Sequence, residues 1–173
     1  MVDVIDFKNA MSMLTSAVSV VTTAGASGQH GFTASAICSV TDTPPTLLVC
    51  MNTSSRSYEH FVANKVLCVN VLTANRLSNH ENLSNVFASG LNQQERFEHG
   101  LWQTLVTGSP VLNDALVSFD CQIEQIQEVG THGIFICPIM AIGQHSQTQE
   151  GQGLVYFNRR YHPVGQIKAL LDG

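Results

Sequence analysis

The segment VSVVTTAGASGQHGFTASAICSV, from Val18 to Val40, carries the main evidence for the fold class. Its first part, Val18–Thr23, is rich in β-branched side chains, which favour extended backbone. Residues 25–31 are rich in glycine and typical of a turn, and Phe32–Val40 can extend again as a second strand. The stretch therefore predicts an antiparallel hairpin.

Short apolar runs separated by turn residues continue on both sides of this hairpin. We expect further strands at Thr46–Asn52, Val66–Leu72, Ala115–Val129, His132–Ile142 and Leu154–Asn158, and helices at Asp6–Ala17, Tyr58–Asn64 and Asn75–Ser89. The stretch from Gly90 to Ser109 is polar and less regular. Strands and helices do not alternate regularly, and no shift in composition marks a linker. This pattern predicts a single domain over residues 1–173, mainly β, in which about seven strands form an antiparallel barrel with flanking helices.

The composition excludes several classes of protein. Hydrophobic residues make up 44% of the chain and charged residues only 12%, against an average of about 25% charged. This composition excludes a disordered chain, and 8 basic residues against 13 acidic ones exclude a general nucleic-acid binder. No apolar run approaches the roughly 18 residues of a membrane-spanning helix. The deficit of charge is unusual for a small monomer, which has much surface to cover.

Cysteine and histidine spacing indicates neither a disulfide framework nor a metal centre. The cysteines lie far apart, form no Cys-x-x-Cys pair and mostly fall in apolar runs; they are Cys38, Cys50, Cys68, Cys121 and Cys137. The N-terminus lacks the basic and long apolar segments of a signal peptide. We therefore expect reduced, buried thiols in a cytoplasmic protein. The histidines show no metal-ligand spacing, so no metal site is expected.

The first candidate site lies on the second strand of the predicted hairpin. Thr33, Ser35 and Ser39 share one face of that strand, because successive side chains point to opposite faces. The small residues around them allow a flat ligand to approach the backbone amides. A solvent-facing stripe of hydroxyl side chains explains the same pattern equally well.

The second candidate site lies where an expected strand meets an expected helix, in Asn52-Thr53-Ser54-Ser55-Arg56-Ser57. Unpaired N–H groups at a helix N-terminus, several hydroxyls and one arginine together suit an anion. Plain N-capping of the helix is the alternative interpretation, and the pattern alone favours it. Together the two candidate sites suit a planar ligand that carries a phosphate group.

Several motifs, spread from Phe7 to about Val164, resemble those of the short-chain flavin reductases that serve two-component monooxygenases. The resemblance rests on GFTASAICSV at residues 31–40, PPTLLVC at 44–50, LCVNVL at 67–72, ERF at 95–97, GTH at 130–132 and YFNRRYH at 156–162. Two branches of the family are similar to this chain. One is the reductase component of 4-hydroxyphenylacetate 3-monooxygenase, and the other is the flavin reductase of the pyrimidine-utilisation pathway.

This resemblance implies a fold, an activity and an assembly. The fold is an antiparallel split β-barrel of the FMN-binding, Greek-key type, and two copies form a homodimer with flavin near their interface. The activity is that of an NAD(P)H:flavin oxidoreductase, in which NADH or NADPH reduces FMN or FAD and the reduced flavin diffuses to a separate oxygenase. A broad apolar interface between two subunits also accounts for the deficit of charge.

The resemblance implies roles for individual residues as well. The expected flavin-binding residues are Thr33, Ala34, Ser35, Ser39, Asn52, Ser55, Arg56, Ser57, Tyr161 and His162. The first four are expected along the isoalloxazine ring and ribityl chain, and the next four near the phosphate. The last two belong to a C-terminal segment that approaches the flavin. His132 is expected to position the nicotinamide.

Two other functions remain open at this point. A non-enzymatic flavin-binding protein, acting as an electron store or sensor, fits the same barrel, because a fold does not determine a function. A purely structural dimerisation module fits it too. Repeated turnover of NADH with excess free flavin separates the enzyme from the store, and absence of flavin binding identifies the structural module.

Overall fold

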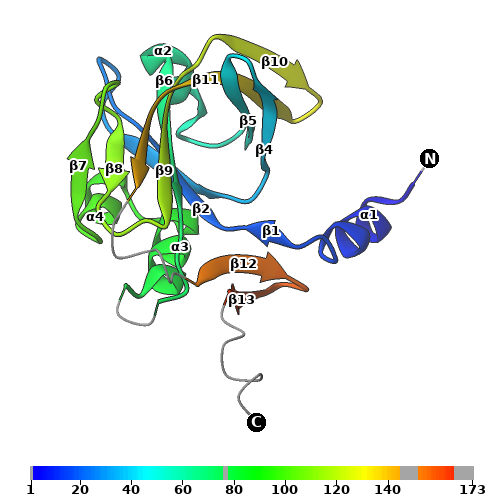
Figure 1. Cartoon of the computed structure of the whole chain (residues 1–173). Helices are drawn as coiled ribbons and strands as arrows, with labels where there is room; N and C mark the ends of the chain where they lie inside the picture. The colour runs from blue at the N-terminus through cyan, green and yellow to red at the C-terminus, as the bar shows by residue number, and fades with distance from the viewer. Residues whose placement is uncertain (1, 76–77, 145–151, 166–173) are drawn as a thin grey trace.

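The computed structural model describes residues 2–75, 78–144 and 152–165, and a curled antiparallel sheet dominates it (Figure 1). Within these residues the sheet has eight strands: β2 (Ser19–Thr23), β3 (His30–Ala34), β4 (Ile37–Asp42), β5 (Pro45–Asn52), β6 (Val66–Val71), β9 (Val117–Gln122), β10 (Gln125–Val129) and β11 (His132–Gln144). Their order is β3-β2-β6-β9-β11-β5-β4, and β10 pairs with β11. All of these pairs are antiparallel.

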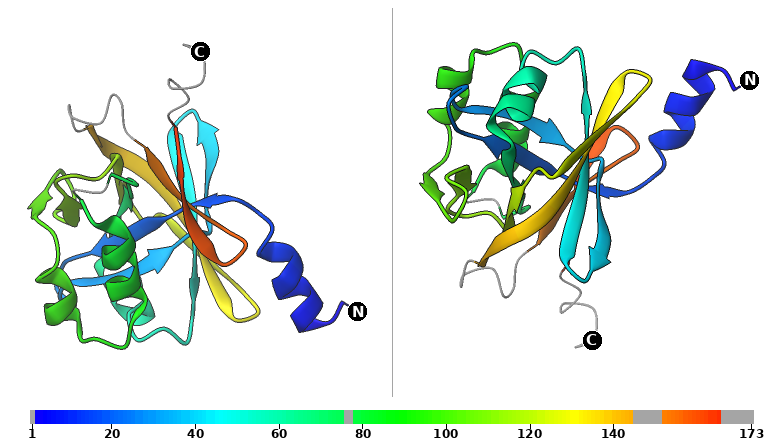
Figure 2. Two further views of the ribbon diagram at one scale, coloured as in Figure 1. Left: turned by 90° about the horizontal axis from the view of Figure 1, so that it is seen from below. Right: turned by 90° about the horizontal axis from the view of Figure 1, so that it is seen from above.

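The long strand β11 curls the sheet into an open barrel. Its first half pairs with β5 on one side and β10 on the other, and its second half pairs with β9. The register shifts between Ile139 and Ala141, and such irregularities bend a strand and increase its twist. Figure 2 shows this strand, in yellow to orange, running across the barrel. The strand β11 therefore joins the side of the barrel formed by β5 and β10 to the side that contains β9.

Two small sheets and four helices surround the barrel in the described part of the chain. One sheet consists of β1 (Ser16–Ala17), β12 (Gly153–Phe157) and β13 (Arg160–Val164), and the other of β7 (Trp102–Thr104) and β8 (Pro110–Leu112). The helices are α1 (Val4–Met11), α2 (Tyr58–Asn64), α3 (His80–Ala88) and α4 (Gln93–Phe97). Helix α1 lies apart from the barrel beside the N-terminus and has no buried residue, although Arg159 in the turn between β12 and β13 donates to its Asn9 at 2.6 Å (Figure 1). None of the described helices is long and apolar enough to cross a membrane.

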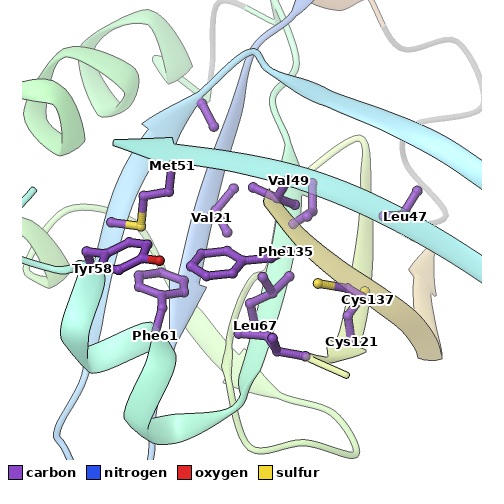
Figure 3. Close-up of a cluster of buried hydrophobic side chains, with 13 residues drawn as sticks. Val21, Leu47, Val49, Met51, Tyr58, Phe61, Leu67, Cys121, Phe135 and Cys137 are labelled. Atoms are coloured by element: carbon purple, nitrogen blue, oxygen red, sulfur yellow. The ribbon is translucent and has the colours of Figure 1, made fainter. Parts of the chain in front are cut away.

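Two hydrophobic clusters hold the barrel and its helices together. The first lies beside α2 and includes Phe61 and Phe135, whose stacked rings have centroids 6.3 Å apart (Figure 3). The second includes Phe87 of α3. Val21 belongs to the first cluster and Val20 to the second, so β2 is buried on both faces. This double burial explains why its sequence is a nearly continuous β-branched run.

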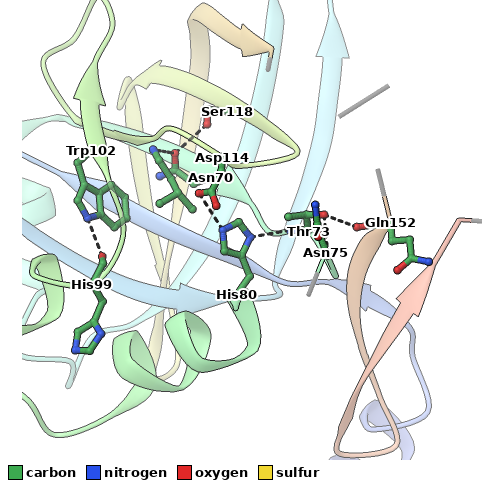
Figure 4. Close-up of polar contacts among 10 residues, drawn as sticks. Asn70, Thr73, Asn75, His80, His99, Trp102, Asp114, Ser118 and Gln152 are labelled. Atoms are coloured by element: carbon green, nitrogen blue, oxygen red, sulfur yellow. Dashed lines mark hydrogen bonds and ion pairs between the residues drawn. The ribbon is translucent and has the colours of Figure 1, made fainter. Parts of the chain in front are cut away.

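Helix α3 is tied to the neighbouring elements by a chain of polar contacts (Figure 4). The Nδ1 atom of His80 accepts a hydrogen bond of 3.0 Å from the backbone N–H of Thr73, and Nε2 of the same ring lies 3.1 Å from Oδ1 of Asp114. The Thr73 hydroxyl donates to the carbonyl oxygen of Gln152 at 2.8 Å. Because β12 begins at the next residue, this chain of contacts connects the small three-stranded sheet to the barrel.

The prediction of a mainly β, antiparallel split barrel is confirmed, but the predicted second strand of the hairpin is wrong. Only β3 pairs with β2, whereas β4 pairs with β5, so that β3 and β4 stand at opposite ends of the strand order. The chain breaks at Ser35 and Ala36, and the N–H of Cys50 donates to the Ala36 carbonyl at 3.0 Å. A continuous strand over Phe32–Val40 could not pair with β2 at one edge of the open barrel and with β5 at the other.

Other predicted boundaries also shift. Ala115–Val129 forms two strands, because the N–H of Ile123 donates to Lys65 at 2.8 Å while that of Glu124 donates to Ile136 at 3.0 Å. The helix expected at Asp6–Ala17 ends at Met11, and the one expected at Asn75–Ser89 begins at His80, with residues 76–77 outside the described part. Five short elements were not predicted: α4, β7, β8, β13 and β1, the last of which lies within the helix expected at Asp6–Ala17.

Candidate functional site

A pocket with a volume of about 780 Å³ lies beside β3, the end of β5, the start of α2 and α4. Eight of the predicted site residues line it: Thr33, Ala34, Ser35, Asn52, Ser55, Arg56, Ser57 and His132. They come from three segments that are far apart in the sequence. The fold therefore brings both candidate sites and the predicted nicotinamide residue to one cavity.

The end of β5 places His132 beside the loop that precedes α2. In the antiparallel register Asn52 lies opposite His132, and the N–H of Thr53 donates to the carbonyl of Thr131 at 3.0 Å. The side-chain oxygen of Asn52 accepts from the N–H of Ser54 at 2.9 Å and from its hydroxyl at 2.8 Å. This local bonding turns the chain sharply after the strand. Strand pairing, not sequence proximity, thus brings His132 to the pocket.

Ser57 does not cap α2, although it occupies the N-cap position. Its side chain makes no capping hydrogen bond, and its hydroxyl instead accepts from Nε2 of Gln93 at 3.1 Å. Ser57 is buried, whereas the neighbouring Arg56 is exposed. Plain N-capping therefore does not explain this residue, and its hydroxyl belongs to the wall of the pocket.

Thr33 turns its hydroxyl proton away from the pocket. The hydroxyl donates to the carbonyl oxygen of Ser84 in α3 at 2.6 Å, which leaves the oxygen lone pairs available to a ligand. The hydroxyl of Ser84 lies 2.9 Å from that of Tyr161, which donates to Asn85 at 3.0 Å. Tyr161 is thus linked to the pocket wall through α3 without lining the pocket.

Three predicted site residues lie outside this pocket: Ser39, Tyr161 and His162. Ser39 lines a separate cavity of about 340 Å³, because the break at Ser35 and Ala36 separates it from Thr33. The predicted hydroxyl stripe is therefore divided between two cavities. His162 lies on β13, with Nε2 3.3 Å from the carbonyl oxygen of Phe157. The flavin and nicotinamide roles of all eleven predicted site residues, inside and outside this pocket, stay predictions.

Seven polar residues of the pocket wall were not among the predicted site residues: His30, Ser54, His60, Ser89, Asn92, Gln93 and Arg96. Gln93 and Arg96 hold β3 at Gly31: the Gln93 side-chain oxygen accepts the Gly31 N–H at 2.9 Å, and Arg96 donates to the Gly31 carbonyl at 2.9 Å. The sequence does contain one signal for the helix that carries Gln93 and Arg96, namely a capping box. Asn92 and Glu95 bond reciprocally and start α4, as their spacing indicates.

The pocket is positively charged, although the chain has a net charge of −5. Arg56 and Arg96 line the pocket, and none of the described residues that line it is Asp or Glu. Burial lowers the pKa of Arg96, and the charge of Arg56 lowers it further. Two buried nitrogen atoms, Nδ1 of His30 and Nε of Arg96, have no hydrogen-bond partner. Cationic side chains and unpaired buried nitrogens suit an anionic ligand.

Comparison with known proteins places most of the chain in one family. Residues 11–165 match the family described as flavin reductase like domain. The chain is 53% identical over 159 residues to the FMN reductase (NADH) RutF of Serratia proteamaculans (strain 568), covering 92% of this chain and 87% of that protein. It is 50% identical over 163 residues to the protein of the same name from Escherichia coli (strain K12 / DH10B), covering 94% and 95%.

A solved structure gives the same result. The crystal structure of a protein from Haemophilus somnus 129pt, described as a flavin reductase, is 58% identical to this chain and has a TM-score of 0.88. The match covers 94% of this chain and 100% of that one. The family match and these identities leave one conclusion: the chain belongs to the flavin reductase like domain family.

Proposed function

We propose that this protein is a flavin reductase that uses NADH to reduce FMN and supplies the reduced flavin to a separate oxygenase. The observation that carries the proposal is the pocket, which joins a carboxylate-free end bearing two arginines to a wall of small residues. The relatives named FMN reductase (NADH) RutF support the choice of flavin and of nicotinamide. Delivery to an oxygenase follows from the resemblance to reductases of two-component monooxygenases.

The charged end of the pocket fits the phosphate group of FMN. Arg56 and Arg96 meet no carboxylate among the residues that line the pocket, and Nε of Arg96 is buried without a partner. Hydrogen bonds between arginine and phosphate are charge-assisted and roughly twice as strong as neutral ones. We assign the phosphate to this end, where it meets Asn52, Ser55, Arg56 and Ser57.

The strand β3 fits the flat ring of the flavin. Thr33, Ala34 and Ser35 line the pocket with small side chains, which permit close approach to the backbone. Because the Thr33 proton is bonded to Ser84, its oxygen is an acceptor for an N–H group of the ring.

The protein's part in the reaction is positioning. The bound flavin supplies the redox chemistry, since it accepts a hydride from the nicotinamide. Such a transfer needs no protein nucleophile, but it requires that two rings be held at near-attack distance. We assign nicotinamide positioning to His132, an exposed residue that lines the pocket opposite Asn52.

We propose a homodimer as the active form. Helix α1 has eight residues and buries none of them, and an isolated helix of this length is unstable in water. Its apolar side chains are exposed, with Ile5 at 69% and Phe7 at 56%. A second subunit that covers α1 would stabilise it. The same contact would explain how a chain with 12% charged residues covers its surface.

The state of the cysteines supports the cytoplasm as the compartment. All five are free thiols, and proteins of oxidising compartments commonly pair theirs. Cys68, Cys121 and Cys137 are buried as expected, but Cys38 is exposed because it lies on the edge strand β4. Burial raises the pKa of Cys121 to about 12, which makes this thiol unreactive.

Steady-state oxidation of NADH in the presence of excess FMN tests the proposed function. A catalytic amount of protein under air should consume many equivalents of NADH per subunit. The alternative, an electron store, stops after about one equivalent per bound flavin. The same assay with FAD and with NADPH should give lower kcat/KM values than FMN and NADH. Consumption of one equivalent or none contradicts the proposal.

A further inference from the structure

We propose that the stacked pair His30–His60 is a proton-linked part of the phosphate site, so that the pocket takes up a proton when it binds the phosphate group of a flavin. This inference rests on the proposed function and deepens it. It assigns two further residues to flavin binding and makes the binding of FMN, but not of riboflavin, depend on pH.

The geometry of the pair is well defined. The two imidazole rings are stacked, with centroids 3.5 Å apart and an interplanar angle of 12°. His30 begins β3 and His60 lies on α2, and both rings line the pocket. The hydroxyl and carbonyl oxygens of Ser27 lie 2.7 Å and 2.9 Å from Nδ1 of His60, which holds that ring in place. Nδ1 of His30, in contrast, is buried without a partner.

Burial and the neighbouring cations disfavour the charged form of His30 in the absence of a ligand. The elements packed around it carry Arg56, Arg96 and two exposed carboxylates, Glu59 and Glu95, neither of which lines the pocket. The Glu95 carboxylate accepts from the backbone N–H of Asn92 at 3.2 Å, within the capping box.

Burial lowers the pKa of His30. The neighbouring His60 lowers it further, a contact with the Ser27 backbone raises it, and Arg96 lowers it again. The ordinary histidine value is about 6.5, so the ring is uncharged at neutral pH.

A phosphate dianion reverses this balance. Negative charge beside an imidazole favours its protonated form. The unpartnered Nδ1 of His30 can then take a proton and donate it to a phosphate oxygen. Only one ring of the pair gains a charge, because two cations in stacked rings repel each other. Binding of FMN should therefore tighten as the pH falls from 8 toward 6.5, and release should be favoured at higher pH.

Titration calorimetry of FMN at pH 7.0, in buffers of different ionisation enthalpy, counts the protons exchanged on binding. A site of arginines alone would cause proton release, because the second pKa of a phosphate monoester is about 6 and its residual proton would be lost. Proton-linked histidines cause net uptake instead, on the order of half a proton per FMN. Riboflavin, which has no phosphate, should bind without proton exchange.

Single substitutions locate the proton. His30→Gln should abolish the uptake and weaken FMN binding about fivefold at pH 7.0, with riboflavin binding within about twofold of wild type. His60→Gln should reduce the uptake and serves as the second test where His30→Gln does not fold. His99→Gln, an exposed histidine outside the pocket, is the matched control and should keep the wild-type uptake.

Proton release by the wild-type protein, or uptake that persists in both pocket variants, overturns the inference. Failure of the proposed function looks different. It appears as the absence of NADH-dependent FMN reduction, whatever the proton count is.

Discussion

At the scale of single residues, two arginines set the charge of the pocket wall. The Arg96 guanidinium donates hydrogen bonds to the carbonyl oxygens of Gly31 and Ser89, and these bonds hold the side chain at the pocket wall. Arg56 lies on the same wall and is exposed. Two cations with no carboxylate on the described wall give the pocket a local positive charge, although the chain as a whole is acidic.

Replacing both Ser55 and Arg56 by alanine should separate the phosphate site from the ring site. We expect the double variant to bind FMN about tenfold more weakly, because hydrogen bonds to a charged group contribute about 1.5–3 kcal/mol each and an exposed arginine is partly screened. Riboflavin affinity should stay unchanged. Quenching of flavin fluorescence on titration measures both ligands, and equal losses for the two would dismiss the phosphate site.

Replacing His132 by alanine should affect nicotinamide use and spare flavin binding. His132 lies opposite Asn52 on the pocket wall, and its Nδ1 atom lies 3.0 Å from the Thr131 hydroxyl. We expect a rise of about tenfold in the KM for NADH, with the FMN dissociation constant within about twofold of wild type. Unchanged NADH kinetics in the variant would show that this histidine has no such role.

At the scale of secondary-structure elements, the contact between α4 and the edge strand β3 shapes the pocket. Both backbone groups of Gly31 are bonded by side chains of α4, from Gln93 and Arg96. An edge strand exposes unpaired backbone groups, and here side chains satisfy them. The same two side chains line the pocket, so a short helix both protects the sheet edge and forms part of the pocket wall.

Gly31→Ala should disturb the packing of β3 against α3 and α4 and destabilise the protein. A Cβ atom at Gly31 would lie 2.6 Å from Cε1 of Phe87, whose ring packs against those of Phe97 and Trp102 at centroid distances of 5.1 Å and 5.6 Å. We expect a loss of about 1–3 kcal/mol in the free energy of unfolding, the usual range for overpacking. Urea denaturation measures this loss.

Gly90→Ala is the matched control for this substitution, because a Cβ atom at Gly90 would meet no other atom within 4 Å. It should leave stability unchanged or slightly higher. Equal stability of the Gly31→Ala variant and wild type would contradict the packing argument.

The N-terminus of α3 should make stability depend on pH through His80. Burial lowers the pKa of His80, and Asp114 offsets part of that shift. Below the ordinary value of about 6.5 the unfolded chain binds a proton that the folded ring resists. Stability is therefore complete above about pH 6.5, falls as the pH falls, and levels off below the lowered pKa of the folded state.

Urea midpoints between pH 5 and pH 7.5 test this dependence. His80→Gln should be less stable than wild type at pH 7.5, because its contact to Thr73 is lost, but its stability should change less with pH. Some slope remains, since the pKa of His30 is lowered as well. His99→Gln, which alters an exposed ring, should retain the full slope. A slope as steep as wild type in His80→Gln would exclude His80 as its source.

At the scale of the whole molecule, the proposed homodimer should depend on α1. Figure 1 shows this helix beside the N-terminus, apart from the barrel, and its residues Val4, Ile5, Phe7 and Met11 are all exposed. Light scattering at micromolar concentration should give the mass of a dimer. Deletion of residues 2–11 should raise the dimer dissociation constant at least about tenfold, because buried apolar area is lost. A monomeric full-length protein at micromolar concentration would contradict the proposal.

Most of the fold was predictable where burial leaves a mark on the sequence. The β-branched run at Val18–Thr23 and the apolar run at Val66–Leu72 became β2 and β6, which lie side by side with nearly every residue buried. Short elements such as α4 were missed, because five residues carry little periodicity and only the capping box indicates them. That residues 1–173 form one domain stays a prediction, which the family match over residues 11–165 supports.

Composition and motifs were enough to predict the β class, the family and the two polar segments that line the pocket, because these are local features of the chain. Three features could not be predicted locally: Phe32–Val40 divides between two sheet edges, Ser39 lies outside the pocket, and Arg96 lines it. The physical reason is that closure of a curled sheet selects strand partners across long sequence separations. Which side chains meet in the pocket follows from that pairing, and no local pattern records it.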